Sequence, residues 1–121
     1  FAPYQTFLYE NLAINSYDLV INTTSAGLKD ELLPCNERLL KGLLSKTKYA
    51  FEVIYGKQTP FLKLAKECQI PCKDGASMLL WQGVFAFELF FELCDIKNLN
   101  PLPSTQQKLI VKAMLEALKL S

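Results

Sequence analysis

The chain has 121 residues, half of them hydrophobic and 21% charged, and its 13 basic and 12 acidic residues give a net charge of +1. This composition indicates one globular domain and excludes an intrinsically disordered chain. Because the charge is nearly balanced and Arg38 is the only arginine, a surface dedicated to nucleic acid is not expected.

The chain contains no histidine and four cysteines, Cys35, Cys68, Cys72 and Cys94. A zinc site normally needs a second close cysteine pair or a histidine pair, so the C-x3-C spacing of Cys68 and Cys72 does not indicate a metal. The apolar content is ample for a core without disulfides, so we expect free thiols, no metal and a cytoplasmic location. No secretory signal is recognisable, and the glycosylation motif Asn22-Thr23-Thr24 is interpreted as a chance match.

The first predicted element is a buried parallel strand at residues 17–22, which reads YDLVIN. It ends in a cluster of turn-forming residues that contains Gly27. A helix is predicted to follow, with Asn36 as its N-cap, and then a second strand at residues 49–55, which Gly56 ends.

A second helix is predicted to begin with Thr59 as N-cap and Pro60 at the first helical position. A very short third strand is expected near residues 70–73. The remainder is helical, with a long helix from about Gly75 to Cys94 and a last helix that begins at Ser104, where Gln107 completes a capping box, and ends near Leu120.

This alternation of strands and helices predicts a right-handed α/β unit with a parallel sheet. Ligands of such sheets bind outside the carboxyl ends of the strands. Three segments are therefore candidates for binding: Thr23–Gly27 after the first strand, Val53–Gly56 after the second, and Asp74–Gly75 after the third.

Gln82 is unusual because it interrupts the apolar run MLLWQGVFAFELFFEL of the long helix. At 100° per residue it lies on the apolar face, far from a stripe expected to face water, which consists of Ser77, Glu88, Glu92 and Asp95. A buried amide without a partner costs about 1–3 kcal/mol, so Gln82 either bonds to a neighbouring carbonyl or binds a ligand. Two glutamates and a glutamine also make a membrane span too costly.

Taken together, three blocks of the sequence resemble the C-terminal half of the shikimate dehydrogenases, in order and in approximate spacing: YDLVINTTSAGL, FEVIYGKQTPFLKLAKE and DGASMLLWQGVFAFELF. The resemblance covers about residues 17–93. It implies a partial Rossmann-like three-layer unit with a short parallel sheet and two C-terminal helices. It also implies an enzyme that uses NADP to interconvert 3-dehydroshikimate and shikimate, in the pathway to aromatic amino acids.

The resemblance further implies roles for individual residues. Tyr55 and Gln82 match positions that hold the substrate, and Gln82 would bond to a shikimate hydroxyl. Positions that line the cofactor cleft correspond to Asn22, Thr23, Thr24, Ser25, Val53 and Gly75. Where the family usually has an aromatic residue followed by aspartate, this chain has Phe51-Glu52, a difference that affects local hydrogen bonding.

No catalytic residue is assigned within the chain, because the catalytic lysine and aspartate of the resembled family belong to an N-terminal domain. The five glycines form no G-x-G-x-x-G loop, and the asparagine-arginine motif for the NADP 2′-phosphate has no counterpart. Residues 1–121 are therefore expected to be the C-terminal part of a dinucleotide-binding domain, with strands and helices at 1–73, an interdomain helix at 74–94 and a last helix at 104–120. By itself this polypeptide is expected to bind NADP weakly and to be inactive.

The sequence is also compatible with two alternative functions. The chain could belong to a relative that acts on quinate or uses NAD, or it could be a non-catalytic α/β protein-interaction module. The long helix carries aromatic residues around much of its circumference, at Trp81, Phe85, Phe87, Phe90 and Phe91. Since bare apolar patches of several hundred Å² tend to find partners, self-association through residues 78–93 is expected.

Overall fold

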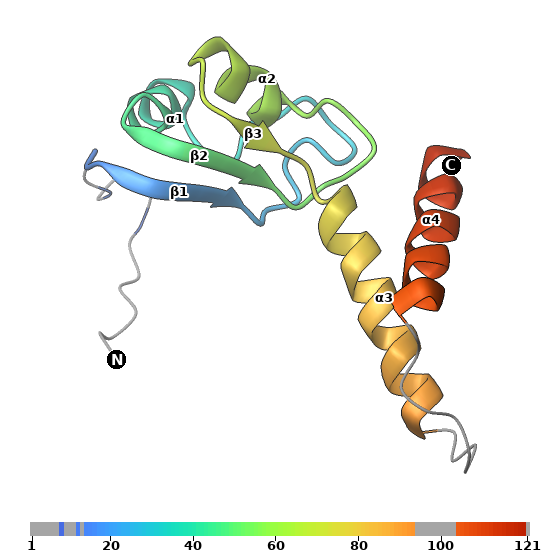
Figure 1. Ribbon diagram of the computed structural model, residues 1–121. Coiled ribbons are helices and arrows are strands. Elements are labelled where there is room, and N and C mark those ends of the chain that lie inside the picture. Colours follow the sequence, from blue (N-terminus) through green and yellow to red (C-terminus); the bar gives the residue numbers. More distant parts are fainter. Residues whose placement is uncertain (1–7, 9–11, 13, 94–103, 121) are drawn as a thin grey trace. The chain divides into compact units, whose positions relative to one another are not determined.

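A computed structural model describes residues 8, 12, 14–93 and 104–120 (Figure 1). The chain divides into two compact units, Phe1–Asp74 and Gly75–Ser121, and each is described by itself. The first unit contains, in chain order, β1 (Tyr17–Asn22), α1 (Glu37–Leu44), β2 (Thr47–Glu52), α2 (Pro60–Glu67) and β3 (Cys72–Lys73). The second unit contains α3 (Ala76–Leu93) and α4 (Ser104–Leu120).

The three strands form one parallel sheet in the order β1-β2-β3, which confirms the predicted α/β class with an open parallel sheet. In β1 and β2, Asn22 is paired with Glu52, so these two polar residues end neighbouring strands side by side. On β3, Cys72 is paired with Ala50. The register therefore brings the exits of β1 and β2 to the same edge of the sheet.

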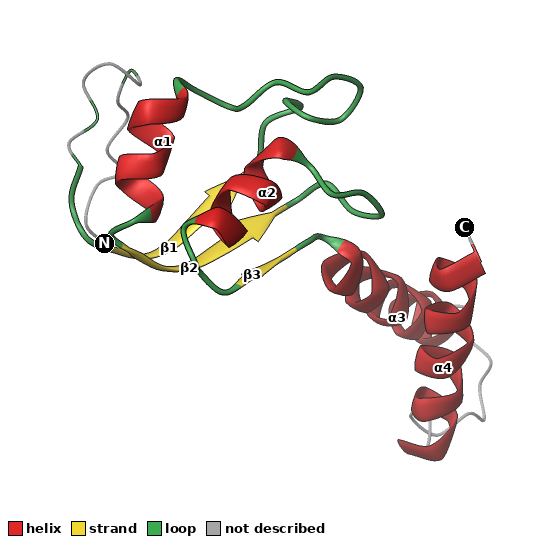
Figure 2. Ribbon diagram, turned by 90° about the horizontal axis from the view of Figure 1, so that it is seen from above, coloured by secondary structure: helices red, strands yellow, loops and turns green. Residues whose placement is uncertain are grey.

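Helices α1 and α2 both cover one face of the sheet (Figure 2). The core between them and the sheet consists of Leu40, Leu44, Ala50, Phe61, Leu64, Ala65 and Ile70. Along each strand, alternate residues point to opposite faces. On the other face Leu19, Ile21 and Tyr49 are about half exposed, at 49%, 49% and 58%. The apolar side chains of that face are thus available to a further layer.

The sequence located the starts of the helices in this unit correctly. The Oδ1 atom of Asn36 accepts hydrogen bonds from the backbone N–H groups of Arg38 and Leu39, and so caps α1. Thr59 Oγ1 accepts from the N–H of Leu62 at 3.3 Å, with Pro60 at the first helical position of α2. Both N-cap predictions are confirmed.

The predicted bounds of the second strand were wrong, because β2 comprises Thr47–Glu52 rather than residues 49–55. The N–H of Val53 still bonds to the carbonyl of Asn22, the last residue of β1. The next N–H, that of Ile54, bonds to the Glu52 side chain at 3.1 Å. The chain therefore turns out of the sheet, although VIY has the composition of a strand.

In the second unit α3 and α4 pack against each other, and two contacts locate the interface. A Cβ atom placed on Gly83 would lie 3.3 Å from the sulfur of Met114. The side-chain amide of Gln107 donates to Glu88 Oε1 at 2.5 Å. Glu88 therefore faces α4 and is half-buried rather than part of a water-facing stripe. That Gln107 completes a capping box with Ser104 stays a prediction.

Within the described residues, no helix is both long and apolar enough to span a bilayer. The same residues contain no cluster of three or more histidine, cysteine or acidic side chains suited to a metal ion. Cys35, Cys68 and Cys72 are free thiols. Cys94 and Asp95 lie outside the described residues.

Candidate functional site

The loop after β1 is organised by the side chain of Asn22, which is only 3% exposed. Its Nδ2 donates to Glu52 Oε2 at 2.9 Å, and its Oδ1 accepts from the backbone N–H and the hydroxyl of Thr24, at 3.1 and 2.8 Å. Both ends of the amide are therefore occupied within the protein. The side chain of Asn22 is thus buried, whereas a glycosylated asparagine lies at the surface.

The same loop turns back at Gly27, whose φ of +86° favours glycine. Its N–H donates to Asp30 Oδ1 at 2.7 Å, and the same oxygen accepts from the N–H of Leu32 at 3.0 Å. The hydrogen bonds from Gly27 and Leu32 lower the pKa of Asp30 below its usual value. The loop after β1 thus has a defined shape that its own residues maintain.

The exit of β2 is organised by Glu52, which is fully buried. Besides the bond from Asn22, Glu52 Oε2 accepts one from the hydroxyl of Thr59 at 2.9 Å, and Oε1 accepts from the N–H of Ile54. Thr59 is itself fully buried and caps α2. One carboxylate therefore connects the ends of β1 and β2 with the start of α2.

These bonds leave a particular set of groups facing outward at the sheet edge. Thr23 and Ser25 are exposed, Thr24 and Val53 are half-buried, and Tyr55 is 50% exposed. The predicted residues of the first unit thus gather on the two adjoining exits of β1 and β2. They offer hydroxyl groups, one apolar side chain and one phenol, whereas the Asn22 amide is buried beneath them.

The remaining predicted residues, Gly75 and Gln82, belong to the second unit. Gly75 is buried, and its carbonyl accepts the N–H of Leu79 in the first turn of α3. Gln82 is exposed, which corrects the expectation that its amide is buried. That Gln82 and Tyr55 face one substrate remains a prediction.

The exposure of Gln82 has a clear cause in its surroundings. The neighbouring apolar side chains on its face of α3 are exposed as well, Met78 at 36% and Leu89 at 55%. The expected faces of α3 were therefore wrong on both sides, because Glu88 faces α4 and no described residue of the second unit covers the face that carries Gln82.

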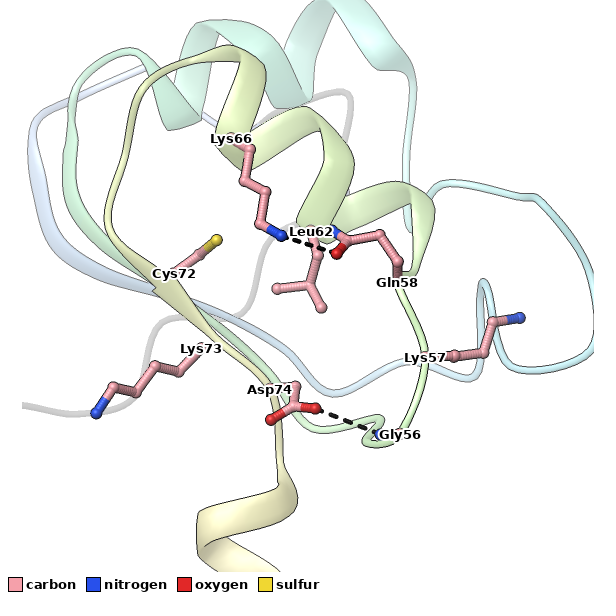
Figure 3. A pocket seen from close by; sticks show the side chains of 8 residues that line it. All are labelled: Gly56, Lys57, Gln58, Leu62, Lys66, Cys72, Lys73 and Asp74. Atoms are coloured by element: carbon pink, nitrogen blue, oxygen red, sulfur yellow. Dashed lines mark hydrogen bonds between the residues drawn. The ribbon is translucent and has the colours of Figure 1, made fainter. Parts of the chain in front are cut away.

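A cavity of about 360 Å³ lies between α2, β3 and the loop after β2 (Figure 3). Leu62 and Cys72 border it, and Lys66 donates across it to Gln58 Oε1 at 2.7 Å. Gly56 and Asp74 also line it, and the N–H of Gly56 donates to Asp74 Oδ2 at 3.3 Å. The cavity adjoins the exits of β2 and β3, since Gly56 and Asp74 of the two candidate segments there line it, but none of the residues predicted to bind the cofactor does.

The sequence interpretation missed the organising role of Glu52 and assigned Thr59 only as a cap. One signal was available, because a glutamate at an inward-facing position of a buried strand must be satisfied by hydrogen bonds. What the sequence could not provide was the identity of the donors, since Asn22 is 30 residues away.

Comparisons with known proteins give two kinds of match, although no family model matches the chain. The shikimate dehydrogenase (NADP(+)) of Helicobacter hepaticus is 60% identical over 75 residues, which are 62% of this chain and 28% of that protein. The protein of the same name from Helicobacter pylori strain J99 is 49% identical over 76 residues, which are 63% of this chain and 28% of the relative. The chain thus spans little more than a quarter of the length of these curated relatives.

Solved structures agree with the fold. A chorismate mutase/shikimate 5-dehydrogenase fusion protein from Clostridium acetobutylicum matches 84% of this chain and 34% of its own, with a TM-score of 0.60 and 25% identity. Shikimate dehydrogenase 1 from Peptoclostridium difficile, at 17% identity and a TM-score of 0.58, supports the fold alone. The resemblance to shikimate dehydrogenases is therefore confirmed, as is the Rossmann-like α/β fold class.

Proposed function

We propose that this chain is the C-terminal part of an NADP-dependent shikimate dehydrogenase, which reduces 3-dehydroshikimate to shikimate in the cytoplasm. The observation that carries the proposal is the 60% identity to a shikimate dehydrogenase over 75 residues. The geometry of the sheet edge supports it, because the matching positions of the first unit gather at the exits of two parallel strands. Ligands of open α/β sheets bind at such exits.

The groups at this edge are suited to holding a dinucleotide. Thr23 and Ser25 offer exposed hydroxyl groups for a polar cofactor, and Val53 offers a half-buried apolar side chain for the nicotinamide ring. NADP, when bound, supplies or accepts the hydride. Asn22 and Thr24 contribute by fixing the loop, and Gly75 by its backbone, so the role of this chain is to position the reactants.

For the substrate, Tyr55 and Gln82 are the groups we assign to hydroxyl recognition. Both side chains are exposed within this chain, so both are free of the burial that would keep them from a ligand. The proton of the reaction would be handled by a lysine and an aspartate of an N-terminal domain. The matched relatives are long enough for such a domain, since this chain corresponds to 28% of their length.

The proposal is tested by assaying the full-length protein that contains this segment, with NADPH and 3-dehydroshikimate. Gln82→Ala should lower kcat/KM ten-fold or more, which corresponds to about 1.4 kcal/mol of lost transition-state stabilisation. Gln58→Ala is the matched control, because Gln58 is an exposed glutamine outside the proposed site, and its kcat/KM should not change. A wild-type protein that reduces no 3-dehydroshikimate would rule out the enzyme and favour the interaction module.

Substrate and cofactor choice are tested in the same assay. We expect shikimate to be oxidised in preference to quinate, and NADP to be used in preference to NAD. The reverse preference in either pair would assign the protein to a relative of different specificity while keeping the reaction type.

The 121-residue chain alone should bind NADP weakly and catalyse nothing. The backbone N–H groups of a glycine-rich loop contribute much of the affinity for a pyrophosphate, and this sequence has no such loop. Isothermal titration of the purified chain with NADP measures this directly. Micromolar or tighter binding would contradict the proposal.

We also infer that the isolated chain self-associates through residues 78–93. Six large apolar side chains of α3 are at least 36% exposed: Met78, Trp81, Phe85, Phe87, Leu89 and Phe90. The rings of Trp81 and Phe85 lie 5.8 Å apart and so form one continuous aromatic surface. In water a surface of this kind favours association.

A further inference from the structure

The side chain of Glu52, the last residue of β2, accepts more hydrogen bonds than the end of a strand requires. Its carboxylate receives three hydrogen bonds and all of them are donated to it, by Asn22 Nδ2, Thr59 Oγ1 and the N–H of Ile54. A carboxylate is the side-chain group that accepts at both ends without donating. The surroundings of Glu52 therefore specify a carboxylate, and not merely a polar group.

Two of the three donors, Asn22 and Ile54, lie in or beside segments that the proposed function assigns to different ligands. Through Oε2, Glu52 holds the amide of Asn22, whose other end fixes Thr24 in the cofactor loop. Through Oε1, it holds the N–H of Ile54, which lies between Val53 and Tyr55. The cofactor loop and the residue that precedes the substrate residue Tyr55 are thus fixed to the two oxygens of one group.

We propose that Glu52 is a positioning residue that sets the substrate residue Tyr55, through the N–H of Ile54, relative to the cofactor loop Asn22–Ser25. The proposal rests on the proposed function for its ligands, and on the hydrogen bonds that Glu52 accepts from Asn22 and Ile54 for its geometry. Glu52 touches no ligand itself, because it is fully buried beneath both segments. Its effect on catalysis is exerted through Tyr55 and Thr24.

Replacing Glu52 by glutamine turns one of the two acceptor oxygens into a donor group. Glutamine has one acceptor oxygen and one NH2 group, and the NH2 group must face a donor in this site. Two donors meet Oε2 and one meets Oε1. An NH2 group at the Oε2 position would lose the bond from Asn22 and force the Thr59 hydroxyl to turn and accept, whereas at the Oε1 position it loses only the bond from Ile54 and leaves the other two unchanged. Glu52→Gln should therefore release Ile54 and Tyr55 and keep the cofactor loop, while Val53 stays held by the bond from its N–H to the carbonyl of Asn22.

Glu52→Asp should have the opposite effect on the two segments. A shorter acidic side chain still accepts readily from the N–H two residues ahead, as in an Asx-turn, but it no longer reaches across to Asn22 and Thr59. Glu52→Asp should therefore keep the Ile54 bond and loosen the cofactor loop.

A third variant controls for stability. Thr59→Val removes one donor to Oε2 and the cap of α2, yet it leaves the bonds to Asn22 and Ile54 in place. It should lower the melting temperature at least as much as Glu52→Gln does. If Glu52 serves only stability, Thr59→Val and Glu52→Gln should change the kinetics in the same proportion.

The experiment measures steady-state kinetics in the full-length protein, together with hydrogen exchange of the peptides that cover residues 22–25 and 53–55. For Glu52→Gln we expect KM for shikimate to rise about ten-fold, which corresponds to the loss of about one hydrogen bond. KM for NADP should change less than two-fold, and residues 53–55 should exchange faster. For Glu52→Asp we expect the rise in KM for NADP instead. For Thr59→Val both KM values should stay within two-fold.

Unchanged kinetics in Glu52→Gln, or a parallel loss in all three variants, would overturn the proposal. If Glu52→Gln does not fold, Glu52→Asp decides, because a ten-fold rise in KM for shikimate in that variant contradicts the retained Ile54 bond. An inactive wild-type protein is a failure of the proposed function instead. Exchange at residues 53–55 would then still decide whether Glu52 fixes that segment.

Discussion

The two units of the chain differ in how they bury apolar side chains. In the first unit, Leu44, Phe61 and Ala65 are at most 1% exposed, and α1, α2 and the sheet enclose them from three sides. In the second unit Leu80 and Val84 are buried, but Phe85 and Phe90 on the same helix are 59% and 66% exposed. The first unit therefore encloses a core, whereas the second presents much of its apolar surface to water.

The difference follows from architecture more than from composition. A sheet that is covered by two helices encloses side chains between layers, whereas two helices packed together bury only the stripe along which they touch. Helix α3 is apolar on more than one stripe, and its remaining apolar faces need another surface. Stability in the first unit should thus depend on its core, and in the second unit on a partner.

The largest effect expected from this comparison is that of Phe61→Ala. Phe61 is 1% exposed at the centre of the first core, and truncation of a buried phenylalanine typically costs about 3–5 kcal/mol. Urea unfolding followed by circular dichroism should therefore show a loss of this size. Phe85→Ala is the matched control on α3 and should cost less than about 0.5 kcal/mol. Equal losses would mean that the two units do not differ in the way described.

A smaller effect is expected at the turn after β1. Gly27→Ala should destabilise the first unit by about 1–3 kcal/mol, because alanine is strained at a positive φ and its Cβ would lie 3.0 Å from Pro60. Gly56→Ala is the matched control, since Gly56 has a φ of +75° with no atom within 4 Å of an added Cβ. It should cost only the backbone strain, about 1–2 kcal/mol. A larger loss at Gly56 than at Gly27 would show that the contact with α2 is unimportant.

Local signals in the sequence predicted most of the first unit. Strand β1 and the caps Asn36 and Thr59 are encoded by adjacent residues, which act over one turn or one strand. The end of β2 was missed because Glu52 overrides the strand composition of the next three residues with a bond to Ile54. Such a bond depends on burial, and burial depends on residues distant in the chain.

The candidate site was predictable to a similar extent. That Thr23, Ser25 and Tyr55 would gather at strand exits followed from the order of strands and helices. The buried state expected for Gln82 did not follow, because a helical wheel gives the direction of a side chain and not what covers it. The burial expected from the sequence pattern therefore differs most from the observed burial in the second unit, where a helix has the fewest packing partners.

The smallest effect on stability, and the most direct test of the second unit, is expected for Phe90→Ser. Phe90 is 66% exposed, so its loss should change the free energy of unfolding of the isolated chain by less than about 0.5 kcal/mol. Removing an exposed aromatic from a surface that associates should nevertheless weaken association, because the apolar area buried between copies decreases. Sedimentation velocity over a range of concentrations should show the variant dissociating at a higher concentration than the wild type. A wild-type chain that stays monomeric at the highest concentration would mean that the apolar surface of α3 does not bind a second copy.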